Sequence, residues 1–399
     1  MRVRGTSRRV DLVIVGTEGG VLVALDEASG RVVWRRALGS TVPGPVFGCP
    51  SFPDRRYGIT GTPVLDRATG RVYAVSAGRA YAVRLADGRI VPRWPVAVAD
   101  PAHEHVWDAV ALSGGLLYFG TASYCDQPPY DGRVVAVDVR TARVAAQFFV
   151  TGASAGRPSG GGVWGWGGVS VDPRDGDVYA ATGNSLTPSE DAGRSERVVR
   201  LTRALRVRQS NAPVTGDTVL DRDFGATPAL LHPDGCPRML SVVNKDGELL
   251  TYDRDRISRG PLQRLTVARG DPEGYVSLIG VTAFAPATRM LYVSSPSDPS
   301  ATVHRRGLLA FHIGRDCRLR LVWRNPAHSD GLTSAPMIAG DVVSLTTGVL
   351  SRLVAVDART GTTLSSTPLG TAGAFAAPTP VDDSIIAAGW DGLVRRLTP

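Results

Sequence analysis

The sequence has 399 residues, of which 43% are hydrophobic and 21% are charged, and its formal net charge is +8. This composition is typical of a globular protein and excludes a disordered chain. The basic residues are almost all Arg, and Lys245 is the one lysine. Because they are scattered among Asp and Glu instead of forming a basic face, we expect no binding to nucleic acid.

Membrane insertion is not expected either. No apolar run approaches the ~20 residues that a membrane-spanning helix requires. Residues 1–10 are basic, but the apolar stretch that follows covers only Leu12–Val15, which is too short for a signal peptide.

A repeat begins with two short apolar segments, Leu12–Thr17 and Val21–Asp26, which a Gly-containing turn separates. Counterparts of the second segment recur at intervals of roughly 40 to 64 residues, which leaves room for four short strands in each repeat. The eight recurring segments are Val21–Asp26, Ala80–Arg84, Val134–Asp138, Val198–Thr202, Leu249–Asp253, Leu308–His312, Leu353–Asp357 and Leu393–Leu397.

The segments are rich in Val, Leu, Ala and Tyr, and turns containing Gly, Asp or Pro bound them, as in strands. No segment has the sustained period of an amphipathic helix. We therefore predict an all-β fold: an eight-bladed β-propeller, with seven blades as the alternative, four antiparallel strands in each blade and residues 1–399 in one domain. The last repeat ends after its third strand, so we expect Arg2–Ser7 to close the ring.

The turn after the first recurring segment is the most specific motif. Ala24–Trp34 resembles the PQQ-type propeller repeat A-x-D-x-x-T-G-x-x-x-W, with Ser29 in place of Thr. Ala355–Gly361 repeats the turn but has Ser365 where Trp is expected, and Trp94 and Trp323 lie near the corresponding place in other repeats. The resemblance implies that Asp and Thr-Gly shape the turn and that Trp packs one blade on the next.

Two later segments carry a second resemblance. Gly160–Trp166 and Val178–Asn184 are similar to the central part of the quinoprotein alcohol dehydrogenases. The resemblance implies that PQQ stacks on Trp164 or Trp166 and that Asn184 ligates a calcium ion. A planar aromatic ring and a hard oxygen ligand suit these two roles.

Three more loops are similar to loops of the same enzymes. In Asn244–Gly247, Lys245 corresponds to the lysine that contacts the quinone. Asp221 or Asp223 falls near the loop of the catalytic base, and Asp126 stands where a calcium-binding Glu is expected. In such a site calcium acts as a Lewis acid on the quinone carbonyl, and the Asp takes the proton of the substrate hydroxyl.

The sequence also departs from the enzyme pattern. No two cysteines are adjacent, although these enzymes carry a vicinal disulfide above the cofactor. CxxCH and CxxC motifs are absent, so we expect neither haem nor zinc. Each site residue has a structural alternative: the two Trp as blade-packing residues, Asn184 as a turn residue, Lys245 in a solvated hairpin turn, and the two Asp as loop caps.

The segment His103–Glu104–His105 could suggest a metal site. On an extended strand the two His point to one side and Glu104 to the other, so we expect ordinary exposed polar residues here.

The cysteines can be placed by their loops. Cys236 lies between the first and second strands of blade five, and Cys317 between the third and fourth strands of blade six. These loops emerge on the same face of neighbouring blades, so we expect a Cys236–Cys317 disulfide. Similar reasoning suggests Cys49–Cys125. Two disulfides would place the protein outside the cytosol.

Three functions remain open. The first is a non-catalytic propeller that binds or scaffolds a protein partner, as exported assembly-factor propellers of this superfamily do. The second is a PQQ- and calcium-dependent alcohol or sugar dehydrogenase, and the third binds a small ligand in the central channel without redox chemistry. We favour the first, as an extracytoplasmic monomer, because the cysteine lid and an electron-transfer module are missing.

Overall fold

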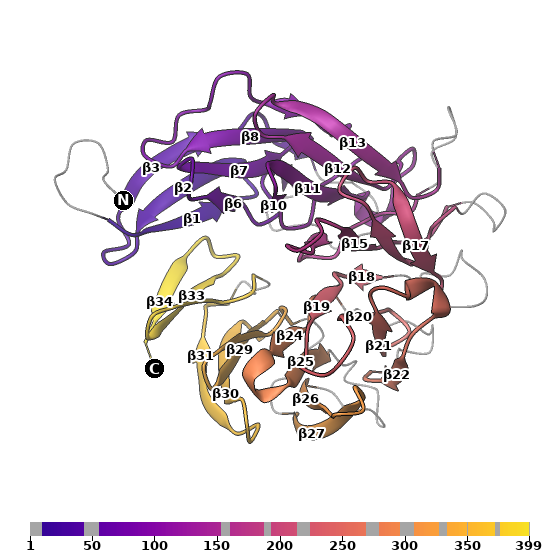
Figure 1. The fold of residues 1–399 in the computed structure, drawn as a ribbon. Helices are drawn as coiled ribbons and strands as arrows, with labels where there is room; N and C mark the ends of the chain where they lie inside the picture. The colour runs from indigo at the N-terminus through magenta and orange to yellow at the C-terminus, as the bar shows by residue number, and fades with distance from the viewer. Residues whose placement is uncertain are drawn as a thin grey trace. The chain divides into compact units, whose positions relative to one another are not determined.

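The computed structural model describes residues 10–43, 56–152, 160–186, 193–213, 224–268, 279–295, 307–326, 333–348, 350–371 and 376–398. Within these residues, eight antiparallel sheets of three or four strands follow one another along the chain (Figure 1). The fold is an eight-bladed β-propeller, which confirms the predicted class and the number of blades. All eight recurring segments are strands, with small differences at their ends.

The chain divides into two compact units, whose boundary runs through the fourth sheet. The first unit comprises Met1–Ser195 and Leu201–Arg208, and the second comprises Glu196–Arg200 and Gln209–Pro399.

The first four sheets contain the following strands: β1 (Leu12–Gly16), β2 (Val21–Asp26) and β3 (Val32–Ala37); β6 (Val64–Asp66), β7 (Arg71–Ser76), β8 (Arg79–Arg84) and β9 (Val96–Ala97); β10 (Ala111–Ser113), β11 (Leu116–Thr121), β12 (Arg133–Asp138) and β13 (Arg143–Phe149); β14 (Ser170–Val171), β15 (Val178–Ala181), β16 (Val198–Leu201) and β17 (Val207–Asn211). A short antiparallel pair joins β4 (Val42–Pro43) to β5 (Arg56–Tyr57).

The last four sheets contain these strands: β19 (Ala229–Leu231), β20 (Met239–Val243), β21 (Glu248–Asp253) and β22 (Gln263–Thr266); β24 (Ala283–Ala285), β25 (Met290–Ser295), β26 (Gly307–Ile313) and β27 (Leu319–Asn325); β28 (Met337–Ala339), β29 (Val342–Thr347), β30 (Arg352–Asp357) and β31 (Thr363–Pro368); β32 (Thr379–Val381), β33 (Ser384–Ala388) and β34 (Val394–Leu397). A short parallel pair joins β18 (Gly225–Ala226) to β23 (Ile279–Gly280).

The repeat motif shapes its turn through one carboxylate. Oδ1 of Asp26 accepts hydrogen bonds from the backbone N–H of Ser29 at 2.8 Å and from its hydroxyl at 2.9 Å. Asp357 binds Thr360 in the same way, at 2.7 and 2.8 Å. The short side chain holds the tight turn between two strands, so the pattern Asp-x-x-Ser/Thr marks this turn for a physical reason.

The motif tryptophans join one sheet to the next. Trp34 on β3 donates its indole N–H to the carbonyl of Leu85, 2.9 Å away in the turn of the second sheet, and its ring packs on Gly88. Trp323 on β27 makes the equivalent contacts with Ala358, at 3.1 Å, and with Gly361. A Cβ on either glycine would lie 2.6–2.7 Å from the indole, so a residue without a side chain allows the ring to dock.

The strand register shows which residue replaces Trp in the repeat that lacks it. Trp34 lies opposite Ala24, Trp323 opposite Ala310, and Ser365 opposite Ala355, and the strand pairing shifts at the same point in all three sheets. Ser365 thus occupies the Trp position of its repeat without supplying the ring.

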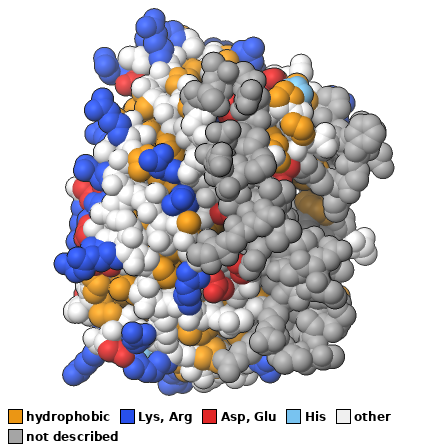
Figure 2. All heavy atoms as spheres, turned by 90° about the vertical axis from the view of Figure 1, so that its right-hand side faces the viewer, with side chains coloured by type: hydrophobic (Ala, Val, Ile, Leu, Met, Phe, Trp, Pro, Cys, Tyr) orange, Lys and Arg blue, Asp and Glu red, His pale blue; other side chains and the backbone are white. Residues whose placement is uncertain are grey.

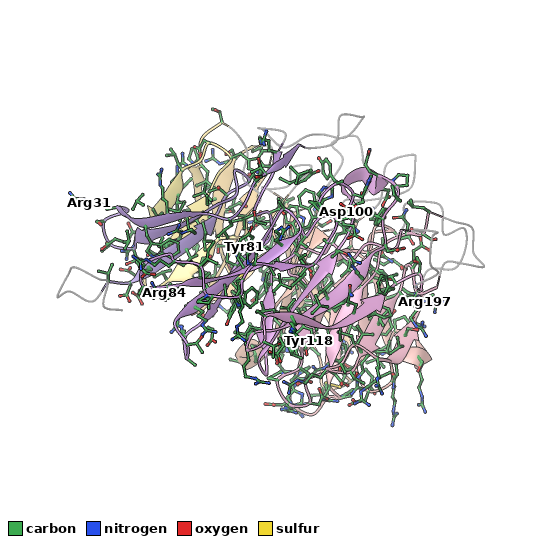
Figure 3. The ribbon with its side chains drawn as sticks, turned by 90° about the horizontal axis from the view of Figure 1, so that it is seen from above. Arg31, Tyr81, Arg84, Asp100, Tyr118 and Arg197 are labelled. Carbon is green, nitrogen blue, oxygen red and sulfur yellow. A yellow bond between two sulfur atoms is a disulfide. The ribbon has the colours of Figure 1, made fainter. Side chains whose placement is uncertain are left out.

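The core lies between successive sheets. Leu22 and Ala24 of the first sheet pack with Ala74 and Tyr81 of the second, and the other face of the second sheet packs on the third through side chains such as Tyr73. Figure 3 shows Tyr81 and Tyr118 among these sheets. The Tyr118 hydroxyl donates to the carbonyl of Arg203 at 2.9 Å, which ties the third sheet to the turn of the fourth.

Cys236 and Cys317 form a disulfide, as predicted, with their Cα atoms 5.6 Å apart. It joins the β19–β20 turn to the β26–β27 turn. Cys49, one member of the suggested Cys49–Cys125 pair, and the closing segment Arg2–Ser7 lie outside the part of the chain that the structure describes.

The surface carries Arg side chains spread over the described atoms, with acidic side chains between them (Figure 2). In the described ranges we find no helix with the length and apolarity that crossing a bilayer requires.

Candidate functional site

The glycine run that precedes the two Trp residues threads between the ends of β11 and β15. Gly161 N–H donates to the carbonyl of Asn184 at 2.7 Å, and Gly183 N–H donates to Gly162 at 2.6 Å. Val163 N–H bonds to Thr121 at 2.9 Å. These backbone bonds bring the segment with Trp164 alongside the loop that carries Asn184.

Two predicted calcium ligands come together here. Asp126 ends the short 3₁₀ helix η1 (Tyr124–Asp126), and its Oδ2 accepts a hydrogen bond from Nδ2 of Asn184 at 3.3 Å, across 58 residues of sequence. The hydroxyl of Tyr130 donates to Oδ1 of the same carboxylate. Carboxylate and amide oxygens are ligands that calcium prefers, but here the amide nitrogen of Asn184 faces Asp126, so a bound cation would require the Asn184 amide to turn its oxygen toward the carboxylate. The described residues hold no group of three His, Cys, Asp or Glu side chains suited to a metal.

Trp164 and Trp166, the predicted floor of a cofactor site, are both half-buried. Trp164 lies next to Gly162, and the carbonyl of Trp166 accepts the backbone N–H of Ala109 at 3.0 Å. The backbone bonds of the glycine run therefore link the segment that carries Trp164 to the loop that carries Asn184.

Of the other predicted site residues, Lys245 lies in the second unit, and the candidate bases Asp221 and Asp223 lie outside the residues that the structure describes. Lys245 sits in the β20–β21 hairpin turn, as expected, but only 8% of it is exposed, so the solvated alternative was wrong. The turn is closed by Asn244, whose Oδ1 accepts the backbone N–H of Glu248 at 2.9 Å.

The expectation of exposed polar residues at 103–105 was wrong for two of the three. Glu104 and His105 are both buried. Glu104 pairs with Arg133 and accepts the backbone N–H of Asp100 at 2.9 Å. Burial raises the pKa of Glu104, and the Asp100 N–H and the Arg133 guanidinium oppose this rise. Local sequence carried no signal for this pairing, because Arg133 comes from another strand.

His105 belongs to an aromatic cluster that the sequence did not reveal. The rings of Tyr57 and His105 are 4.2 Å apart, and Trp107 and Tyr124 pack beside Tyr57 at 6.1 and 5.6 Å. Nδ1 of His105 accepts the backbone N–H of Tyr124 at 3.2 Å. Burial, with a smaller effect from His103, lowers the pKa of His105 to about 4, so this ring is neutral near pH 7.

Asp108, one residue after this cluster, is fully buried. Its Oδ2 accepts the N–H of Gly120 at 2.5 Å, whereas Oδ1 has no hydrogen-bond partner within the described residues. Burial raises the pKa of Asp108 well above its ordinary value, and the backbone N–H groups of Gly120 and of Asp108 itself offset only part of this rise.

Asp108→Asn is therefore expected to raise the free energy of unfolding at neutral and alkaline pH, by about 1–3 kcal/mol. Between the ordinary Asp pKa and the raised folded pKa, the folded state keeps a proton that the unfolded state loses, so this group's contribution to stability falls as pH rises. The gain of the Asn variant over the natural protein should grow across this window in urea unfolding. Asp357→Asn is the control with the opposite sign, because the Thr360 N–H lowers the pKa of Asp357. A gain independent of pH would contradict the titration of Asp108.

Comparison with known proteins identifies the family. A family model described as "Outer membrane protein assembly factor BamB" matches residues 4–255, more than half of the chain. The chain belongs to this family of PQQ-type repeat propellers. No curated protein matches the sequence.

Solved structures share the fold at low identity. Quinohemoprotein alcohol dehydrogenase ADHIIG from Pseudomonas putida HK5 is 16% identical, with a TM-score of 0.68 over 95% of this chain and 69% of that one. A europium-containing methanol dehydrogenase is also 16% identical, with a TM-score of 0.68 over 96% and 80% of the two chains. BamB from Moraxella catarrhalis is 14% identical, with a TM-score of 0.61 over 98% and 92%. At these identities the likeness shows the fold alone.

Proposed function

We propose that this protein is a binding or scaffold module that holds a protein partner on one propeller face. The observation that carries the proposal is a set of exposed apolar side chains on equivalent turns of the last two sheets. Leu350 lies in the β29–β30 turn, and Trp390 and Leu393 lie in the β33–β34 turn, with 57%, 41% and 55% of their surfaces exposed. We call these three residues the apolar turns.

The location of the apolar turns in the fold supports a role in binding a partner. β28 lies against β32, so the two sheets are neighbours, and equivalent turns of neighbouring blades emerge on the same face. Exposed apolar side chains gathered on one face mark interaction sites, and Trp is enriched among residues that dominate binding energy. Membership of a family described as an assembly factor supports the same function, and the Cys236–Cys317 disulfide supports a location outside the cytosol.

The test is photo-crosslinking in the native host from a reactive amino acid placed at position 390. We expect one dominant crosslinked protein, and we expect Leu350→Ser with Leu393→Ser to abolish the product. Leu262→Ser is the matched control, because Leu262 is 42% exposed on another part of the second unit. Equal crosslinking in all variants, or none in the natural protein, would reject the apolar turns as the site.

A second candidate function rests on a different observation. Asp126 and Asn184 come together beside the Trp164 segment, as a PQQ- and calcium-dependent alcohol or sugar dehydrogenase would require. Asp126 and Asn184 would then hold the calcium, and Trp164 would support one face of the quinone. The bound quinone would supply the electron acceptor, and calcium would polarise its carbonyl.

This candidate is tested by titrating the protein with PQQ in the presence and absence of calcium. Quenching of Trp fluorescence reports binding, and reduction of an artificial dye with added alcohols reports activity. If the second candidate holds, Asn184→Ala and Trp164→Ala abolish binding, whereas Trp390→Ala does not. If PQQ does not bind in a calcium-dependent way, the dehydrogenase function is rejected, and the proposed scaffold function is unaffected.

A further inference from the structure

The environment of the Cys236–Cys317 disulfide is asymmetric. Nη2 of Arg289 lies 3.4 Å from Sγ of Cys236. Sγ of Cys317 instead lies 3.9 Å from the carbonyl oxygen of Gly235 and 3.8 Å from that of Arg315. A guanidinium favours a thiolate, whereas the negative ends of carbonyl dipoles disfavour one. The two sulfurs therefore differ in their capacity to carry negative charge.

Both cysteines are half-buried in surface turns, so exposure does not separate them. In thiol–disulfide exchange, the sulfur that forms the more stable thiolate is the better leaving group. The position of Arg289 thus selects Cys236 as the leaving sulfur and Cys317 as the sulfur that an incoming thiolate attacks.

We propose that this disulfide is a directional thiol-exchange site, which small thiols open at Cys317. The incoming thiolate forms a new S–S bond with Sγ of Cys317, and the bond to Cys236 breaks. The electron pair of that bond goes to Sγ of Cys236, which leaves as a thiolate beside the Arg289 guanidinium. The products are a mixed disulfide on Cys317 and one free thiolate, so atoms and electrons balance.

The two turns remain tied together after the bond opens. Arg289 also donates to the carbonyls of Asp234 in the β19–β20 turn and of Gly314 in the β26–β27 turn, the latter at 2.9 Å. Its Nε donates to Ile313 at 2.8 Å, and its own carbonyl accepts the Ile313 N–H at 2.9 Å. These bonds do not involve sulfur, so the opened site stays in place and can close again.

The first test traps the exchange. The folded protein is first treated briefly with reduced glutathione alone. An excess of maleimide is then added, which alkylates the remaining glutathione and any released protein thiol, and the peptides are mapped by mass. We expect glutathione on Cys317 and maleimide on Cys236, with the opposite arrangement about tenfold rarer. Equal or reversed labelling, or no labelling of this pair, overturns the proposal.

The second test measures the thiolate directly. In Cys317→Ser, the pH dependence of Cys236 alkylation should have its midpoint about one unit below the ordinary thiol pKa of ~8.5. Arg289→Gln in this background should raise the midpoint, and Arg289→Lys should restore part of the shift. Arg324→Gln is the matched control, because it removes one exposed positive charge from β27. An ordinary midpoint in Cys317→Ser alone would refute the role of Arg289 even if an Arg289 variant failed to fold.

Discussion

Trp34→Ala is expected to lower the free energy of unfolding by about 3–5 kcal/mol, the range for removing a buried Trp side chain. Only 8% of Trp34 is exposed, and its ring fills the space between the first two sheets. The substitution would also leave the carbonyl of Leu85 without the indole N–H. Collapse around the cavity is limited, because Gly88 offers no side chain that could fill it.

The measurement is the midpoint and slope of urea unfolding, followed by far-UV circular dichroism and by intrinsic fluorescence. Trp390→Ala is the matched control, since 41% of Trp390 is exposed in a turn, and we expect a change within about 0.5 kcal/mol. A loss no greater for Trp34 than for Trp390 would show that the motif Trp does not join the sheets.

Loss of the Cys236–Cys317 disulfide is expected to lower the free energy of unfolding by about 4.5 kcal/mol. The bond closes a loop of 81 residues, and chain-entropy arguments give this magnitude for a loop of that length. The folded state should change little, because Arg289 keeps the two turns together through backbone carbonyls. The effect therefore arises mainly in the unfolded chain.

Three variants test this origin: Cys236→Ala, Cys317→Ala and the double variant, each compared with the natural protein by urea unfolding. All three should lose the same amount, because either substitution removes the whole cross-link. If the two losses add in the double variant, they arise from the packing of the individual side chains instead. An unchanged urea midpoint would mean that the cross-link hardly restrains the unfolded chain.

Sequence reasoning succeeded where a local rule sets the structure. Asp26 and Ser29 form their turn through bonds across three residues, so the motif could be read from the sequence. The alternation of short apolar strands with such turns indicated the propeller. The Cys236–Cys317 pair followed from strand order, because the loop between the first and second strands of one blade and the loop between the third and fourth strands of the next emerge on the same face.

Sequence reasoning failed where partners come from distant strands. Glu104 read as an exposed polar residue until Arg133, on β12, accounted for its burial. The structural alternative for Lys245, a solvated turn residue, was wrong because the residue is buried. The hydrogen bond between Asp126 and Asn184 joins loops of different sheets, and resemblance to the dehydrogenases suggested only their common role.

The amino-acid sequence by itself determined the repeat, its turns and the number of blades, because strand periodicity and turn chemistry act within a few residues. Only the tertiary structure decided which polar side chains are buried, which sulfur faces Arg289 and which apolar side chains remain exposed on the turns. Those outcomes depend on contacts between sheets, where side chains far apart in the chain determine one another's charge and access to water.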